Sequence, residues 1–196
     1  MSYMAVNRLL YSMNGYPPSR RISQQRAQSI LSVPVPTAPP DTLSRIDASG
    51  TRRRCQALAV LGWSIVWQAR QIGMVPGDLH GAVRGDSGVA ARTAAKIQRL
   101  YDQYWNRTPP ASVSSTLARR AAEQRGWLPP LAWDDDLIDL SEADLAAELS
   151  RRVDAMDDEE LRRCSTAYKA EGDRSPLISA AAREWRRRLE SDRAAA

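Results

Sequence analysis

The stretch Ile65–Arg84, IVWQARQIGMVPGDLHGAVR, limits the possible folds most strongly, because it has the spacing of a helix-turn-helix. Ala69 has the small side chain that is needed where two helices cross closely. Gly73 follows four residues later and can take the left-handed conformation that ends a helix and turns the chain. Pro76 suits the first turn of a second helix, where its missing N–H has no intrahelical partner. The stretch therefore predicts two short helices with a bend at Gly73.

Two interpretations of this bend remain open. One is a DNA-binding helix-turn-helix, and the other is a tight helical hairpin, which also packs a small residue against a glycine turn. In both, the underside of the second helix is apolar, with Met74, Leu79 and Val83. The charge distribution favours DNA, because residues 1–133 hold 17 Arg and Lys against 6 Asp and Glu, whereas residues 134–163 hold 4 against 12. Nearly all the cations are arginine, which suits bidentate contacts to phosphate and guanine, although a GC-rich genome gives the same bias.

The composition is that of a globular protein. A chain of 196 residues with 43% hydrophobic residues can form one or two small domains with a real core. Its two cysteines, Cys55 and Cys164, are too few for a disulfide framework or a metal quartet, and we expect both as thiols on helix faces. No apolar run reaches the length of a membrane span, and the N-terminus has no apolar signal-peptide core. We therefore expect a soluble cytoplasmic protein without a membrane partner.

Helical patterns along the chain predict an all-α fold in four parts. These are a partial second helix-turn-helix unit (residues 1–33), a Pro-rich linker (34–48), a repressor-like helix-turn-helix domain (49–139) and a C-terminal helical region (140–196). The first part has helical patterns over 3–13 and 22–33 and matches the third part, with Ile22 on Val89, Ala27 on Ala94 and Ile30 on Ile97. It is predicted as a recognition helix plus the following helix. A coincidental pair of amphipathic helices is the alternative.

Capping residues predict where the helices begin and end. The expected N-caps are Thr51, Ser114 or Ser115, and Ser141. A long helix is expected from Val89 to Trp105, and Gly126 is expected to end the helix after residue 112. In the C-terminal region, apolar residues at four-residue spacing predict helices that form a small bundle or a dimerisation hairpin, so a homodimer through these helices is a candidate assembly.

Two features follow Gly126. Trp127 and Trp133 flank the residues PPLA, and we expect them to pack against the central domain rather than to stack on bases. Asp134, Asp135 and Asp136, with Asp139, have carboxylates suited to a hard cation. No glycine-turn calcium loop surrounds them, and Asp is common ahead of a helix. A solvated acidic turn is therefore the favoured interpretation.

Several of these motifs together resemble a group of helix-turn-helix proteins from actinobacteria and their phages. The resemblance covers residues 49–139 and rests on GTRRRCQALAVLGW, on the bend itself, on VAARTAAKIQRLYDQYW and on RRAAEQRGWLPPLAWDDDLID. The segment LLY…GYPPSRRIS is similar to an upstream unit in that group. The resemblance implies a DNA-binding regulator. One departure is that the second helix carries Pro76, Gly77 and Gly81, which leaves few side chains to read bases.

The sequence gives little support to an enzyme. His80 is the only histidine, so a histidine-based triad or a histidine pair on a metal is excluded within one chain. There is no Walker A sequence and no Gly-rich dinucleotide fingerprint. No cofactor or metal is expected. His80 itself is either a donor to a base or phosphate or an exposed structural histidine.

We expect a double-stranded DNA-binding transcriptional regulator, a repressor, whose second helix enters the major groove. The candidate contacts in the central unit are Gln71, Val75, Gly77, Asp78, His80 and Arg84. The candidate backbone contacts are Arg52, Arg53, Arg54 and Arg92, with Asn7, Arg8, Arg20 and Arg21 from the N-terminal part. A protein-interaction or assembly module, with the helix-turn-helix as scaffold, is the alternative function. The glycines of the second helix and the partial first unit favour that alternative.

Overall fold

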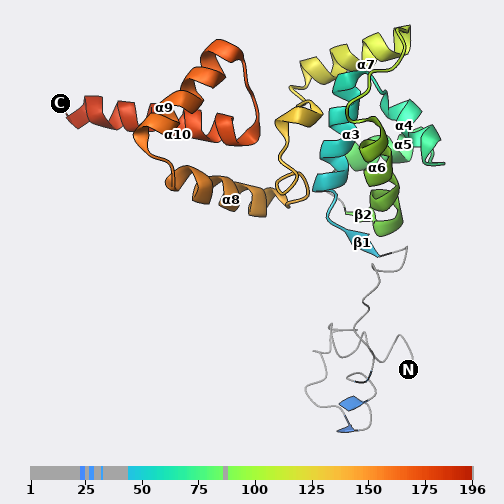
Figure 1. Ribbon diagram of the computed structural model, residues 1–196. Helices are drawn as coiled ribbons and strands as arrows, with labels where there is room; N and C mark the ends of the chain where they lie inside the picture. The colour runs from blue at the N-terminus through green and yellow to red at the C-terminus, as the bar shows by residue number, and fades with distance from the viewer. Residues whose placement is uncertain (1–22, 25–26, 29–31, 33–43, 86–87, 196) are drawn as a thin grey trace. The chain divides into compact units, whose positions relative to one another are not determined.

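The computed structural model describes residues 23–24, 27–28, 32, 44–85 and 88–195, in two units, Met1–Pro39 and Pro40–Ala196 (Figure 1). The helix expected over 3–13, the internal repeat and the candidates Asn7, Arg8, Arg20 and Arg21 lie outside the described residues. Of the helix expected over 22–33, the described residues show two backbone hydrogen bonds between residues four apart, from the Ala27 N–H to the Ser23 carbonyl at 3.0 Å and from the Ser32 N–H to the Gln28 carbonyl at 2.8 Å.

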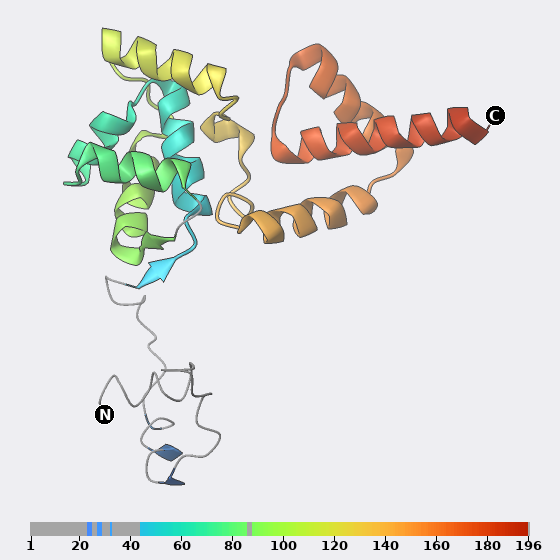
Figure 2. The ribbon, with the colours of Figure 1, turned by 180° about the vertical axis from the view of Figure 1, so that it is seen from behind.

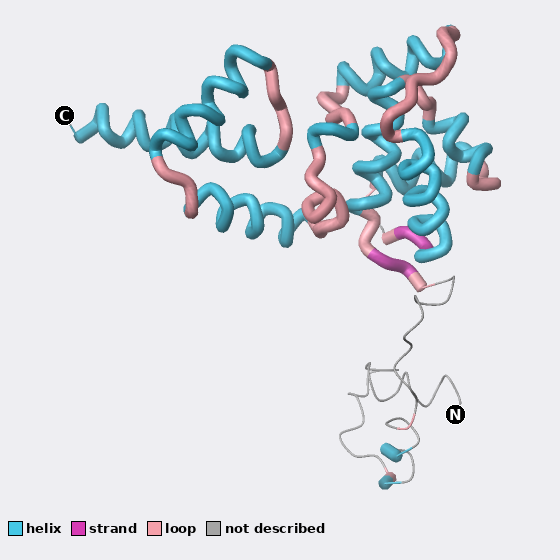
Figure 3. Tube along the Cα trace, in the orientation of Figure 1, coloured by secondary structure: helices cyan, strands magenta, loops and turns pink. Residues whose placement is uncertain are grey.

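The second unit is helical, as the sequence predicts (Figures 1 and 3). Its elements are β1 (Arg45–Ile46), α3 (Ser49–Leu61), α4 (Ile65–Gln71), α5 (Pro76–Arg84), β2 (Val89–Ala90), α6 (Ala91–Tyr104), α7 (Val113–Gln124), the 3-10 helix η1 (Pro130–Ala132), α8 (Glu142–Asp154), α9 (Asp158–Thr166), the π-helical turn η2 (Ala167–Glu171) and α10 (Pro176–Ala195).

A small antiparallel sheet interrupts the helices, which the sequence did not predict. Ile46 pairs with Val89 and Arg45 with Ala90. The end of the expected linker therefore belongs to a strand, and the helix expected from Val89 begins at Ala91. The β-branched residues Ile46 and Val89 favour the extended conformation, and burial of Val89 against the unit holds it there.

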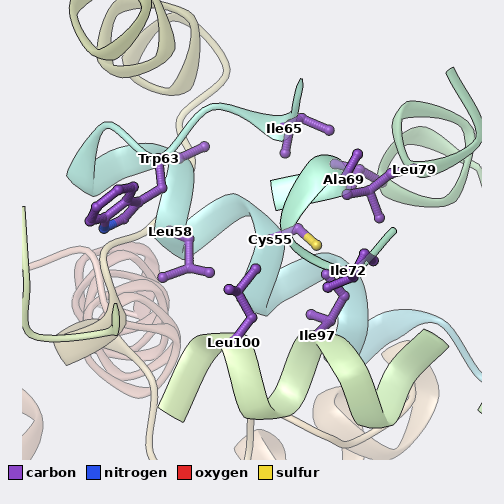
Figure 4. Packing of buried hydrophobic residues seen from close by; sticks show 11 residues of the cluster. Cys55, Leu58, Trp63, Ile65, Ala69, Ile72, Leu79, Ile97 and Leu100 are labelled. Atoms are coloured by element: carbon purple, nitrogen blue, oxygen red, sulfur yellow. The ribbon is translucent and has the colours of Figure 1, made fainter. Parts of the chain in front are cut away.

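The core of the unit forms around α3, which packs against α5, α6 and α7. Cys55 and Leu58 of α3 are buried facing Ile97 and Leu100 of α6 (Figure 4). Trp63, just after α3, lies with its ring centroid 4.2 Å from that of Trp67. Burial of these side chains is the main favourable term in the folding of α3–α6.

Two helices and a bend stand where the sequence predicts them. The hydroxyl of Ser64 caps α4 by accepting from the Trp67 N–H at 3.2 Å. Gly73 has a φ of +69°, in the left-handed region. Pro76 is the first residue of α5, and Leu79 and Val83 of that helix are buried as predicted.

Two predicted N-caps are wrong, Thr51 and Ser114 or Ser115, whereas the N-cap Ser141 and the helix end at Gly126 are confirmed. The helix α3 begins at Ser49, and its N-terminal Ser49 N–H is bound by the Asp47 carboxylate at 2.8 Å, so Thr51 lies inside the helix. Ser112, rather than Ser114 or Ser115, caps α7, in a reciprocal pair with Ser115 three residues later. Ser141 caps α8, and Gly126 follows α7 with a φ of +63°.

The C-terminal helices pack on one another. Val153 of α8, Leu161 of α9 and Ala181 of α10 are buried together, and Trp185 packs against them. The helices α9 and α10 lie side by side in both views of the ribbon (Figures 1 and 2). Val153, Leu161 and Ala181 are thus covered within one chain. None of the helices in the described part of the chain is both long and apolar enough to cross a bilayer.

Two glycine-to-alanine substitutions test the bend. Gly73→Ala should lower the free energy of unfolding by about 1–2 kcal/mol, because the left-handed conformation crowds a Cβ against the following carbonyl. Gly81→Ala, inside α5 with open space around its Cα, should raise it by about 0.5–1 kcal/mol. Urea denaturation followed by circular dichroism measures both. Equal effects of the two substitutions would contradict the assigned turn.

Candidate nucleic-acid interface

One side of α5 is buried and the other is exposed to solvent. Leu79 and Val83 point into the core with 0% and 3% exposure. Gly77, Asp78, Gly81 and Arg84 are exposed, and His80 is half-buried. Gln71 and Val75 are exposed on the turn before the helix. We call the surface formed by Gln71, Val75, Gly77, Asp78, His80, Gly81 and Arg84 the α5 face.

Hydrogen bonds hold α4, the helix before the α5 face, in place. The Gln68 side chain has no exposed surface, and its Nε2 donates to the Cys55 carbonyl at 3.0 Å and to the Trp63 carbonyl at 2.8 Å. The Lys96 ammonium of α6 donates to the Ile72 carbonyl at 2.8 Å. This bond satisfies one of the carbonyls left open where α4 ends. The helix before the bend, α4, is therefore held to α3 and α6, whereas α5 is anchored by the burial of Leu79 and Val83.

Exposed arginines lie on α5 and on the helices before and after it in the chain. Arg84 ends α5, Arg70 lies in the last turn of α4, and Arg92 lies in the first turn of α6. All are exposed, and no hydrogen bond or ion pair joins their guanidinium groups to another described residue. The sequence patterns did not predict a role for Arg70. Its place one residue before Gln71, in the last turn before the bend, is the signal that would have identified it.

The structure corrects the prediction that Arg53 and Arg54 contact phosphates. Arg53 is 3% exposed and donates through Nη1 to the carbonyls of Leu137, at 3.3 Å, and Ile138, at 3.1 Å, and also to that of Leu140. Its Nη2 lies 3.1 Å from a Glu142 carboxylate oxygen, close enough for an ion pair but without hydrogen-bond geometry. Both arginines point into the segment 137–142 because they lie on the side of α3 that this segment covers.

Arg54 and Arg52 bind acidic residues of the same region. Arg54 is 8% exposed and holds the Asp139 carboxylate with both terminal nitrogens, one of them at 2.8 Å. This hydrogen bond lowers the pKa of Asp139 and raises the pKa of Arg54. Arg52 donates to Glu142 at 3.3 Å and to the Ser49 hydroxyl at 3.2 Å. The Arg52 guanidinium is thus already engaged by the protein.

The tryptophans and the acidic turn lie as the sequence predicts. Trp127 packs against the core of α3–α6, and the Arg53 guanidinium lies 5.1 Å from the ring centroid of Trp133. Asp134 accepts from Arg152 at 3.3 Å, and Asp136 is also bound to Arg152. Arginines therefore neutralise these carboxylates. Among the described residues, no three His, Cys, Asp or Glu side chains gather as a metal site requires.

The cysteines lie on helices, as expected. Cys55 of α3 is fully buried, and Cys164 of α9 is half-buried. Burial raises the pKa of Cys55 to about 12, so its thiol is protonated near neutral pH. Cys55 is therefore a core residue rather than a nucleophile.

Comparison of the chain with protein-family models, with curated proteins and with solved structures finds no match. The arrangement of the α5 face and its arginines is thus the observation from which a function is argued.

The ion pair between Arg54 and Asp139 gives a pH-dependent prediction. Asp139→Asn should lower the free energy of unfolding by about 1–2 kcal/mol near neutral pH, because a nearly buried guanidinium loses a charged partner that is itself half exposed. The pKa of Asp139 is lowered in the folded protein, so the stabilisation is complete above its unfolded pKa of about 3.9 and disappears as the pH falls through the lower, folded value.

Urea denaturation of the wild type and of Asp139→Asn, repeated from neutral to acid pH, measures this difference. Asp135→Asn is the matched control, because Asp135 is exposed and makes no hydrogen bond with another described residue. A difference between wild type and Asp139→Asn that stays constant down to about pH 2 would show that the charge of Asp139 contributes nothing.

Proposed function

We propose that this protein binds double-stranded DNA and regulates transcription, with α5 lying in the major groove. The observation that carries the proposal is the two-sided character of α5. Its inner residues anchor it to α3, while its outer side presents Gly77 and Gly81 to solvent between exposed arginines. The major groove is about 12 Å wide and admits a helix.

In this proposal the glycines of α5 let the helix backbone approach the DNA closely, and they do not themselves read bases. A helix surface without side chains lets the backbone approach another surface closely. Arg70 and Arg92 would then contact phosphates, which supply most of the affinity of a DNA-binding protein. The side chains left to contact base edges are Gln71, which pairs with adenine, Arg84, which pairs with guanine, and Asp78, which accepts from the cytosine amino group.

Arg53 and Arg54 take no part in this proposed interface. Their guanidinium groups are satisfied within the protein, so releasing them would break the contacts with residues 137–142. The positive charge available to DNA is therefore smaller than the sequence suggests. We expect modest affinity from one copy of the chain.

Binding to a fluorescent random duplex of about 20 base pairs, measured by anisotropy at about 50 mM and about 200 mM salt, tests the proposal. Affinity should fall steeply with salt, because each phosphate contact releases counterions. Arg84→Glu combined with Arg92→Glu should weaken binding at least about tenfold. Arg162→Glu combined with Arg163→Glu, the same charge change on exposed residues of α9, is the matched control.

No measurable binding at low salt would reject the proposal and favour a protein-interaction module. Equal losses in the two double variants would show that net charge, rather than the α5 face, attracts DNA. A selection from a random duplex library would then identify any preferred site. A palindromic site would indicate a two-fold dimer on DNA.

Gly81 gives a second test of the same interface. Gly81→Leu should leave the fold intact, since beyond the helix's own backbone and the chain neighbours no atom of a described residue lies within 4 Å of a Cβ built at this position. Its side chain should nevertheless hold α5 away from the groove and weaken duplex binding at least about tenfold, whereas Gly81→Ala should weaken it less. Anisotropy with the same duplex measures both, and circular dichroism checks the fold. Unchanged binding by Gly81→Leu would remove α5 from the contact surface.

A further inference from the structure

A groove with a volume of about 930 Å³ lies between α7 on one side and α4 with α5 on the other. Val113, Leu117 and Ala121, at every fourth residue of α7, form one wall. Ile65 and Val66 of α4 and Val83 of α5 contribute apolar surface to the opposite wall. We call this the α7 groove.

The α7 groove leaves large aliphatic side chains uncovered. Val113 is 78% exposed, Leu117 58% and Val66 37%. A contiguous apolar surface of this kind marks an interaction site more often than a solvated face. DNA does not cover such a surface well, because phosphates and sugars need polar or cationic partners. We therefore expect a ligand that covers the groove to have an apolar face.

The charges around the groove define the rest of the occupant. Arg70, Arg84 and Arg125 line it, one from each of its three helices or their ends. Among the described residues that line the groove, none is Asp or Glu. Arg70 and Arg84 make no ion pair with other described residues. The Arg125 guanidinium donates to the Ala121 carbonyl, at 2.9 Å, and lies over the Trp127 ring, and it makes no ion pair with another described residue. An occupant with carboxylates beside its apolar side chains would complement these cations.

We propose that the α7 groove binds an acidic amphipathic helix of a partner protein. The wall of α7 from Val113 to Arg125 spans about 18 Å, which corresponds to about three turns of a docked helix. Such a helix would place apolar residues at i, i+4 and i+7 against Val113, Leu117 and Val66, and its acidic residues beside the arginines.

Segments of this chain fit the groove less well. The N-terminal stretch 3–13, YMAVNRLLYSM, has apolar residues but carries Arg8 and no acidic residue, so it lacks the complementary charge. The helix α8 is acidic in its first turn, but Leu145 and Val153 of that helix are already buried. A second copy of the chain would offer the same helix α8, whose apolar residues are already buried. A helix from a different protein is thus the occupant that the charges and the apolar walls favour.

A displayed library of peptides of about 16 residues, with Leu fixed at i, i+4 and i+7 and the other positions random, tests the proposal against the full-length protein. We expect selected peptides to be enriched in Asp and Glu at the positions flanking the leucines. The best peptide, labelled with fluorescein, is then measured by anisotropy. Leu117→Asp should weaken its binding at least about tenfold, because a carboxylate would enter the apolar wall and repel the acidic peptide.

Leu131→Asp is the matched control, since Leu131 is 85% exposed and does not line the groove. It should bind the peptide as the wild type does. A second variant, Arg70→Glu with Arg125→Glu, should reverse the preference, so that a peptide with Lys in place of each acidic residue binds better than the acidic one. Arg70 and Arg84 line the groove and also belong to the proposed DNA interface, so the peptide and a duplex would compete for them. Both peptide results are measured without DNA, so failure of one proposal is distinguishable from failure of the other.

Four outcomes would overturn the proposal. They are selected peptides without acidic enrichment, equal losses in Leu117→Asp and Leu131→Asp, peptide binding that is seen only after residues 1–43 are removed, and a concentration-dependent dimer in sedimentation that Leu117→Asp abolishes. The third outcome would assign the groove to the chain's own N-terminal segment, and the fourth would assign it to a second copy.

Discussion

The burial of two arginines on α3 is the constraint on which the unit most depends. Moving a guanidinium out of water costs several kcal/mol unless carbonyls or carboxylates replace the lost hydration. Arg53 obtains three carbonyls and Arg54 obtains a carboxylate, all from residues 137–140. The path of the chain after η1 is therefore set by the need to satisfy α3. Arg53 and Arg54, which the sequence predicts on a DNA-binding surface, instead stabilise the fold through their contacts with residues 137–140.

The glycines of α5 lower the stability of this helix and leave its outer surface without side chains. Two glycines in nine residues weaken a helix, since each costs about 0.5–1 kcal/mol relative to alanine. The cost is offset by Leu79 and Val83, which are buried, and by the hydrogen bonds that fix α4 and α6 around the bend. Neighbouring helices thus maintain α5, so its outer side is free of a structural role.

Local patterns were sufficient for most of the helical architecture. Gly73, Pro76, Leu79 and Val83 predict the bend because each acts through its own backbone preference or through spacing within one helix. The capping error at α7 has a local origin, since three serines lie near its start. Ser112 has the extended backbone that allows its hydroxyl to reach the N–H three residues on, whereas Ser114 and Ser115 lie inside the helix. The DNA-binding function and the partial unit in residues 1–33 remain predictions.

Contacts between residues far apart in the sequence could not be predicted from local sequence patterns. Arg53 and its carbonyl partners are more than 80 residues apart, so nothing in the run RRRC distinguishes buried arginines from exposed ones. The α7 groove likewise needs α4, α5 and α7 side by side. The spacing of Val113 and Leu117 is visible in the sequence, but it indicates a buried helix face as readily as an open wall.

The segment 137–142 also decides how much of the chain a self-sufficient fragment must contain. A fragment ended after the last core residue of α7 would leave two cations of α3 without partners in a nonpolar setting. One that continues through Glu142 would retain every acceptor that Arg53 and Arg54 use. Limited proteolysis should accordingly spare this connection, and the smallest stable product should end beyond it rather than at the close of α7.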